Sequence, residues 1–219
     1  MPVFRELRTE VSVAHVPWSQ CLGAPRESAL VAAVEACGGP VILVGWSLGC
    51  LVSLEAVAAR PGRVSGMVLA AGTARMTAKD DYPGLEGRKL GTMRRRFERE
   101  PDRVIREFCQ LCLAPREDEE LLALLLRMAE RQDATALAAG LGYLENTDLR
   151  PLLPALTLPV IVLHGQLDAV IPYASGECLS RRLSRARLET FGGEGHALLY
   201  SAAGEVARAI RSLLDGCGT

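Results

Sequence analysis

The chain has 219 residues, of which 49% are hydrophobic and 23% are charged, and its formal net charge is −1. This composition is typical of one compact globular domain, and a near-neutral charge gives no reason to expect a nucleic-acid partner. No apolar run at the N-terminus resembles a signal peptide, and no segment approaches the length of a membrane span. Seven cysteines, an odd number, fit reduced thiols better than a disulfide framework. We therefore expect a cytoplasmic, monomeric protein that does not bind a membrane.

Strand and helix patterns alternate at both ends of the chain. Apolar strand-like runs occur near residues 11–16, 41–45, 66–71, 159–164 and 187–191. Helix-like composition lies between or after most of them, at residues 26–37, 48–60, 174–184 and 199–214. Strands that alternate with helices indicate a mostly parallel sheet with helices on both faces. The sequence therefore predicts the α/β class.

The middle of the chain breaks this pattern. No strand signal occurs there, and four helical stretches take its place, at residues 88–99, 101–112, 118–131 and 133–144. Asp118, followed by two glutamates and a leucine-rich run, is typical of a helix start. We predict a helical cap over residues 73–150, inserted in a core that is made of residues 1–72 and 151–219.

A GxSxG motif, Gly45-Trp-Ser-Leu-Gly49, joins an apolar run to a helical pattern. In a strand–turn–helix unit of this kind, the serine is exposed at the carboxyl edge of the sheet. The two glycines lack Cβ atoms and let the strand and the helix approach each other. The positive end of the helix and the free N–H of Leu48 would lie beside an oxyanion formed there. Ser47 is thus predicted to be a nucleophile, and the alternative is a structural serine in a tight turn.

A serine hydroxyl needs a base to take its proton and an acid to hold that base. We favour His196, in a glycine-rich loop after the last predicted strand, as the base. His15 and His164 are interpreted as packing or hydrogen-bonding residues of strands. For the acid we favour Asp168, just past a predicted strand, where catalytic groups of open α/β sheets gather. A turn or helix cap is its alternative reading, and Glu194 is the weaker competitor. The order serine, aspartate, histidine is the one expected of α/β-hydrolases.

Several motifs together resemble a known enzyme family. The Gly-Trp-Ser-Leu-Gly motif is followed by Ala-Ala-Arg-Pro-Gly-Arg-Val-Ser-Gly-Met-Val-Leu-Ala-Ala, then by Asp81-Tyr-Pro-Gly, Thr147-Asp-Leu-Arg, His164-Gly-Gln-Leu-Asp and Gly195-His. Over nearly the whole chain this set is similar to the pimeloyl-[acyl-carrier protein] methyl ester esterases of biotin synthesis, which have the α/β-hydrolase fold.

The resemblance implies removal of a methyl ester from a pimeloyl chain carried on acyl carrier protein, and no cofactor or metal is expected. In that reading Ser47 attacks the ester carbonyl and His196 shuttles the proton. Asp168 then orients His196, and the N–H of Leu48 donates to the oxyanion. The resemblance also implies that two residues within these motifs, Trp46 and Tyr82, contact the substrate.

One part of the family pattern is missing from the sequence. The family carries an upstream strand that ends in a His-Gly-Trp-like loop, which supplies a second oxyanion N–H, and no His-Gly pair precedes Ser47 here. The segment His15-Val-Pro-Trp18 is not a substitute, because its distance from Ser47 matches a later strand of the family. Either the sequence starts too late, or the strands at 11–16 and 41–45 pair directly. Loss of one oxyanion donor costs about 3 kcal/mol, so we expect weak activity.

The predicted cap is rich in arginine. Residues 88–106 contain eight basic side chains and three acidic ones. One interpretation is a solvated helix face with some ion pairs. The other, which the resemblance favours, is a docking surface for an acidic acyl carrier protein. The candidate docking residues are Arg95, Arg96, Arg99, Arg127 and Arg131, and the last two are four apart on one helix face.

Three functions stay open at this point. The favoured one is a carboxylesterase of the biotin pathway. The second is a hydrolase of generic small esters, which the same catalytic groups would serve. The third is a catalytically impaired hydrolase fold that binds acyl chains or a protein partner, because one oxyanion donor is missing.

Overall fold

A computed structural model describes residues 2–7 and 11–217. Four parallel strands form a sheet in the order β1-β2-β3-β4. Both inner strands are buried at every residue, whereas the outer strands are partly exposed. Inner strands of this kind are continuous apolar runs because helices cover both of their faces. The strands are β1 (Ile42–Trp46), β2 (Gly66–Ala70), β3 (Val160–Gly165) and β4 (Ala186–Phe191).

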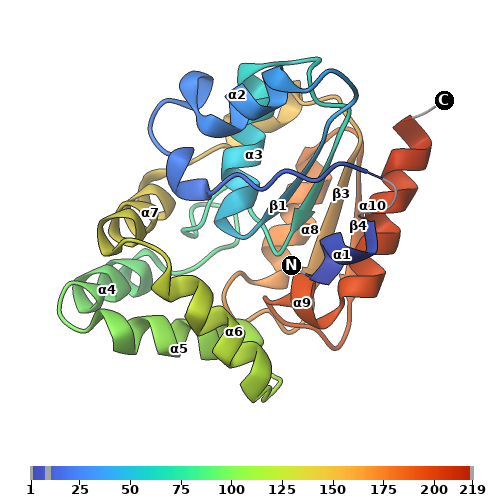
Figure 1. Ribbon diagram of the computed structural model, residues 1–219. Coiled ribbons are helices and arrows are strands. Elements are labelled where there is room, and N and C mark those ends of the chain that lie inside the picture. Colours follow the sequence, from blue (N-terminus) through green and yellow to red (C-terminus); the bar gives the residue numbers. More distant parts are fainter. Residues whose placement is uncertain (1, 8–10, 218–219) are drawn as a thin grey trace.

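Helices cover the two faces of the sheet (Figure 1). One face packs against α2 (Ala29–Ala36), α3 (Leu48–Ala59) and α8 (Tyr173–Arg182). The other face packs against α1 (Pro2–Leu7), α9 (Leu198–Ser201) and α10 (Ala203–Cys217). Successive side chains of a strand point to opposite faces. In β2, therefore, Met67 and Leu69 join the α3 side of the core, and Val68 and Ala70 join the α10 side.

Four helices lie between β2 and β3 and group together at the lower left of Figure 1. They are α4 (Gly87–Phe97), α5 (Pro101–Leu113), α6 (Glu119–Glu130) and α7 (Ala134–Asn146). Arg75 and Asp148, where the chain enters and leaves this insertion, form an ion pair of 2.8 Å. The two residues also form an antiparallel bridge, so the base of the insertion is closed. Short 3-10 helices complete the fold at η1 (Trp18–Gln20), η2 (Pro25–Glu27) and η3 (Arg150–Ala155).

The predicted strand at residues 11–16 is wrong. This segment has no strand assignment, and residues 12–15 are exposed. Within the described chain β1 pairs with β2 alone, so the alternative of a direct pairing of 11–16 with 41–45 is wrong as well. An apolar run permits a strand, but a ladder also needs a neighbouring edge at hydrogen-bond distance. The described part of this segment instead leads into η1 as an irregular thread (Figure 1).

The other predicted elements agree with the structure to within a few residues at most ends. The helix predicted at 26–37 begins later, at Ala29, where the Ser28 side chain accepts a hydrogen bond from the N–H of Val31. The helix predicted at 199–214 is two helices, α9 and α10, which break at Ala202. Across residues 2–7 and 11–217, no helix combines the length and the apolar character needed to cross a membrane.

Candidate active site

The GxSxG segment forms a tight turn between β1 and α3. Ser47 has a φ of 54° and a ψ of −122°, a backbone conformation that is rare for a residue with a side chain. Such a conformation costs on the order of 1–3 kcal/mol and persists only where the surroundings enforce it. Part of that enforcement is a hydrogen bond of 3.0 Å from the Ser47 N–H to the carbonyl of Ala70. The turn lifts the half-buried Ser47 out of the end of β1.

Only one of the two glycines in this turn is required by packing. A Cβ atom on Gly45 would lie 2.7 Å from the carbonyl oxygen of Gly49 and 2.9 Å from the Cα of Cys50. A Cβ atom on Gly49 would meet no atom within 4 Å. The predicted role of Gly45 in the close approach of strand and helix is confirmed, and the same role for Gly49 is wrong. The reason is that a Cβ atom on Gly49 would point into open space.

The structure brings the three predicted catalytic side chains into one hydrogen-bonded series. The Nε2 atom of His196 lies 2.9 Å from the Oγ atom of Ser47. The Nδ1 atom of His196 lies 2.9 Å from the Oδ2 atom of Asp168, and both of these side chains have no exposed surface. The residues follow the carboxyl ends of β1, β3 and β4, so three strands of one parallel sheet deliver them to the same edge of that sheet.

The carboxylate of Asp168 is held by several donors. Its Oδ1 atom accepts hydrogen bonds of 2.8 Å from the backbone N–H groups of Val170 and Ile171. Burial by itself would raise the pKa of Asp168, but hydrogen bonds from His164, His196 and the Ile171 N–H hold the pKa well below its usual range. A carboxylate that stays ionised accepts the Nδ1–H of His196 and leaves Nε2 free to accept the Ser47 hydroxyl.

Comparison with known sequences identifies the family. The sequence pattern described as "Alpha/beta hydrolase family" matches residues 12–209. The chain belongs to the alpha/beta hydrolase family. Its similar relatives include pimeloyl-[acyl-carrier protein] methyl ester esterases, and two from Neisseria meningitidis, of serogroups A and B, are each 36% identical over 180 residues. These matches cover 81% of this chain, and they cover 58% of the serogroup A protein and 70% of the serogroup B protein.

A third relative of the same name, from Methylococcus capsulatus, is 35% identical over 71% of this chain and 63% of its own length. Among solved structures, a thermophilic esterase from Thermogutta terrifontis has a TM-score of 0.79 and 23% identity, covering 100% of this chain and 85% of that chain. An esterase from Exiguobacterium antarcticum has a TM-score of 0.79 and 21% identity, covering 85% of this chain and 70% of that chain. At these identities the two structures show that the hydrolase fold is shared.

Glu194 lies in the loop of His196 but bonds to other groups. Its carboxylate pairs with Arg116 and accepts a hydrogen bond of 2.5 Å from the Ser201 hydroxyl. The N–H of Ala197, next to His196, donates to the carbonyl of Cys112 at 3.0 Å. The end of α5 and the residues after it thus anchor the loop that carries His196.

Trp46 also contacts this loop, which the sequence did not reveal. Its Nε1–H donates to the backbone carbonyl of His196 at 2.8 Å, and the two ring centroids lie 5.7 Å apart. The Trp46 ring meets the Tyr200 ring edge-on at 5.6 Å.

Leu48 is the first residue of α3, where backbone N–H groups have no partner within the helix. The role of the Leu48 N–H as a donor to an oxyanion stays a prediction.

Tyr82 lies in the core near the base of the insertion. Its hydroxyl is 3.1 Å from the Oγ1 atom of Thr73 and accepts a hydrogen bond of 3.0 Å from the N–H of Ala74. The guanidinium groups of Arg150 and Arg182 each lie 5.5 Å from the centre of its ring. These contacts give the buried Tyr82 hydroxyl its hydrogen-bond partners. Its contact with substrate stays a prediction.

The candidate docking arginines lie on the insertion. Arg95 and Arg99 are exposed, whereas Arg96 pairs with Glu107 at 2.8 Å. Arg127 and Arg131 are exposed at the end of α6. An open groove of about 520 Å³ runs between α4 and α5, and it combines charged and apolar side chains. Its lining residues are Arg88, Lys89, Thr92, Met93, Arg96, Val104, Glu107, Phe108 and Leu111.

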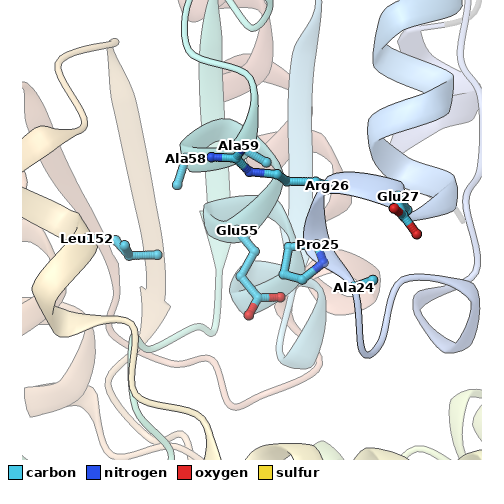
Figure 2. A pocket seen from close by; sticks show the side chains of 8 residues that line it. All are labelled: Ala24, Pro25, Arg26, Glu27, Glu55, Ala58, Ala59 and Leu152. Atoms are coloured by element: carbon cyan, nitrogen blue, oxygen red, sulfur yellow. The ribbon is translucent and has the colours of Figure 1, made fainter.

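A second open groove, of about 480 Å³, lies between η2, α3 and η3, and Figure 2 shows its lining. The residues are Ala24, Pro25, Arg26, Glu27, Glu55, Ala58, Ala59 and Leu152. Burial raises the pKa of the Glu55 carboxyl despite a hydrogen bond of 2.8 Å from the Tyr143 hydroxyl. The three residues of the hydrogen-bonded series are not part of this lining, so the groove is separate from the candidate active site.

Proposed function

We propose that this hydrolase is a serine carboxylesterase that removes the methyl ester from a pimeloyl chain carried on acyl carrier protein. The observation that carries the proposal is the hydrogen-bonded series of Ser47, His196 and Asp168 at the carboxyl edge of the sheet. It occurs in a chain that is 36% identical to proteins named as pimeloyl-[acyl-carrier protein] methyl ester esterases.

In the first step Ser47 attacks the ester carbonyl as His196 Nε2 takes the hydroxyl proton. The new C–O bond leaves a negative charge on the former carbonyl oxygen, beside the N–H of Leu48 and the positive end of α3. Asp168 stabilises the imidazolium that forms. The tetrahedral intermediate then collapses, and the imidazolium gives its proton to the departing methoxide, which leaves as methanol.

In the second step water releases the acyl group from Ser47. His196 Nε2 takes a proton from the water as the water oxygen attacks the acyl carbonyl. When this intermediate collapses, the proton passes to Ser47 Oγ, and the free carboxylic acid is formed. The same hydrogen-bonded series thus serves both halves of the reaction, and neither half requires a metal or a cofactor.

The helical insertion is a second observation in favour of a substrate that is bound to a carrier protein. In this proposal residues 73–150 form a cap whose exposed arginines, Arg95, Arg99, Arg127 and Arg131, attract an acidic carrier. Charges of opposite sign raise the rate of association even when they add little affinity. The groove between α4 and α5 places apolar side chains, Met93 and Phe108 among them, beside this charge. A helix of a carrier protein with acidic and apolar side chains has matching chemistry.

A panel of esters tests the proposal. We expect kcat/KM to be higher for the carrier-bound pimeloyl methyl ester than for free methyl pimelate or p-nitrophenyl esters, with the Ser47→Ala variant as the blank. Equal values for carrier-bound and free methyl esters would indicate a hydrolase of generic small esters. Binding of the carrier without hydrolysis of any ester would indicate the impaired binding module, and it would contradict the proposed activity.

A further inference from the structure

A second histidine touches the carboxylate of Asp168. His164, in β3, has no exposed surface, and its Nε2 atom lies 3.4 Å from the Oδ2 atom of Asp168. The same nitrogen lies 3.0 Å from the backbone carbonyl oxygen of Ile171. The proposed reaction uses His196 and leaves His164 without a task. The contact nevertheless joins His164 to the acid on which that reaction depends.

The hydrogen-bond partners settle which ring nitrogen carries the hydrogen. A carbonyl oxygen only accepts, so the Nε2 atom of His164 is the donor to Ile171. The Oδ2 atom of Asp168 lies at the longer distance of 3.4 Å from the same nitrogen, in contact with the donor but outside its main hydrogen bond. The Nδ1 atom of His164 has no hydrogen-bond partner among the described residues. The one donor of the ring thus bonds to Ile171 and lies close to Asp168.

Close packing holds the His164 ring in this pose. A Cβ atom on Gly176, in α8, would lie 2.4 Å from the Nδ1 atom and 2.8 Å from the Cγ atom of His164. The ring of Tyr173 meets the imidazole edge-on, with centroids 6.0 Å apart. Rotation of the imidazole would therefore drive it into α8. Because the ring is fixed, the direction of its Nε2–H is fixed as well.

Ile171 closes a small circuit of hydrogen bonds. Its N–H donates to the Oδ1 atom of Asp168 at 2.8 Å, while its carbonyl accepts from His164. The carboxylate is thereby held at Oδ1 by the backbone and is approached at Oδ2 by His164. This arrangement limits rotation of the carboxylate plane about its Cβ–Cγ bond. With the plane limited, Oδ2 stays directed at the Nδ1–H of His196.

We infer that His164 is a positioning residue, which uses its Nε2–H to hold the Asp168 carboxylate in the orientation that His196 requires. The inference rests on the proposed function, because this orientation affects a rate only if His196 acts as the base. A small error in the placement of a catalytic group can cost on the order of a hundredfold in rate. The loss of His164 should therefore lower kcat and change KM little, because the effect lies on the chemical step.

Two substitutions separate the hydrogen bond from the packing. His164→Phe keeps a ring of similar size and removes the donor, whereas His164→Gln can place its side-chain amide N–H near the position of Nε2. The matched control is His15→Phe, in the exposed segment before η1. The measurements are kcat and KM on a p-nitrophenyl ester, which needs no carrier, the rate of Ser47 labelling by a fluorophosphonate, and the melting temperature.

We expect His164→Phe to lower kcat and the labelling rate by roughly tenfold to a hundredfold, with KM within about twofold. His164→Gln should recover most of this loss, and His15→Phe should match the wild type. Wild-type kcat in a folded His164→Phe variant would overturn the inference, as would an equal loss in the glutamine variant. If the phenylalanine variant does not fold, His164→Asn replaces it, because its amide is too short to reach the Nε2 position; the inference then requires glutamine to exceed asparagine.

The same experiment distinguishes this inference from the proposed function. If the wild-type protein hydrolyses no ester and Ser47 is not labelled, the proposed function fails and the positioning role fails with it. If the wild-type protein is active and the variants of His164 are equally active, the positioning role alone fails.

Discussion

Asp168 and the arginines of α4 are both charged, but their surroundings differ. The Asp168 side chain has no exposed surface and meets a dedicated set of donors, which come from Val170, Ile171 and His196. The side chain of Arg96 is 41% exposed, and its partner Glu107 also accepts a hydrogen bond from Arg103. The charge of Asp168 therefore has fixed, buried partners. The charges of α4 have partners that are shared between several side chains and are also exposed to solvent.

This difference sets how much a single change can do in each region. Removing one partner of a buried charge leaves the remaining partner desolvated and uncompensated, which is costly. An exposed ion pair contributes about 0–1 kcal/mol, and salt screens it. We therefore expect single substitutions at the buried series to have large effects that salt does not change. On the insertion, several substitutions together should have a modest effect that salt removes.

The largest effect is expected at Ser47. Ser47→Ala should abolish labelling by a fluorophosphonate and lower kcat by on the order of 10⁶-fold, since in the proposed reaction this group forms the covalent intermediate. The melting temperature should stay within a few degrees of the wild type. Ser53→Ala, in the helix that follows Ser47, is the matched control and should keep the labelling. Labelling that survives Ser47→Ala, or that moves to another serine, would remove the nucleophile assignment.

The next largest effect compares two carboxylates. Asp168→Asn should lower kcat by on the order of 10⁴-fold, because the amide cannot stabilise the imidazolium and favours the wrong tautomer of His196. Glu194→Gln should cost less than about tenfold, since Glu194 bonds to Arg116 and Ser201. Steady-state kinetics on one ester measures both variants. If the ranking were reversed, Glu194 would be the acid.

A smaller effect concerns stability in acid. The pKa of Asp168 is lower in the folded protein than in the unfolded chain, so the ionised carboxylate stabilises the fold above about pH 4. This contribution is lost as the pH falls through the unfolded and then the folded pKa, at about 1.4 kcal/mol for each unit that separates them. The difference in unfolding free energy between wild type and Asp168→Asn should therefore shrink below pH 4. Urea titrations at pH 7 and pH 3 measure it, and a constant difference would contradict the assignment of a low pKa.

The smallest effect is expected on the insertion. Reversal of Arg95, Arg96 and Arg99 to glutamate should lower kcat/KM for the carrier-bound ester by about tenfold at low salt, because the proposed docking of the carrier is steered by charge. The free methyl ester should be unaffected, and about 0.5 M salt should abolish the difference between variant and wild type.

The matched control for this experiment makes the same change in net charge elsewhere, at Arg181, Arg185 and Arg208, which are exposed on other elements. It should leave both substrates unaffected. Equal losses on the carrier-bound and the free ester would indicate damage to the insertion or the site. No loss on either would leave the α4 arginines as ordinary surface.

The sequence by itself determined the features that depend on neighbouring residues. Four of the five predicted strands and the helices of the insertion follow from apolar periodicity, which acts within a window of a few turns. The GxSxG motif placed Ser47 in a turn between a strand and a helix, because Gly45 leaves room that no other residue allows. Asp168 and His196 were found because both follow strands whose carboxyl ends meet at one edge of the sheet.

Only the tertiary structure decided which of these groups touch. His196 meets Ser47 across 149 positions of the sequence, and Trp46 reaches the carbonyl of His196 across 150. Such partners are chosen by how helices and strands pack, and local preferences carry no information about them. The same reason explains why the strand predicted at 11–16 is wrong, since this apolar run has no neighbouring strand edge. It also explains why the sequence did not predict the proposed role of His164. The hydrogen bond from His164 to Ile171 depends on a ring that is packed against Gly176.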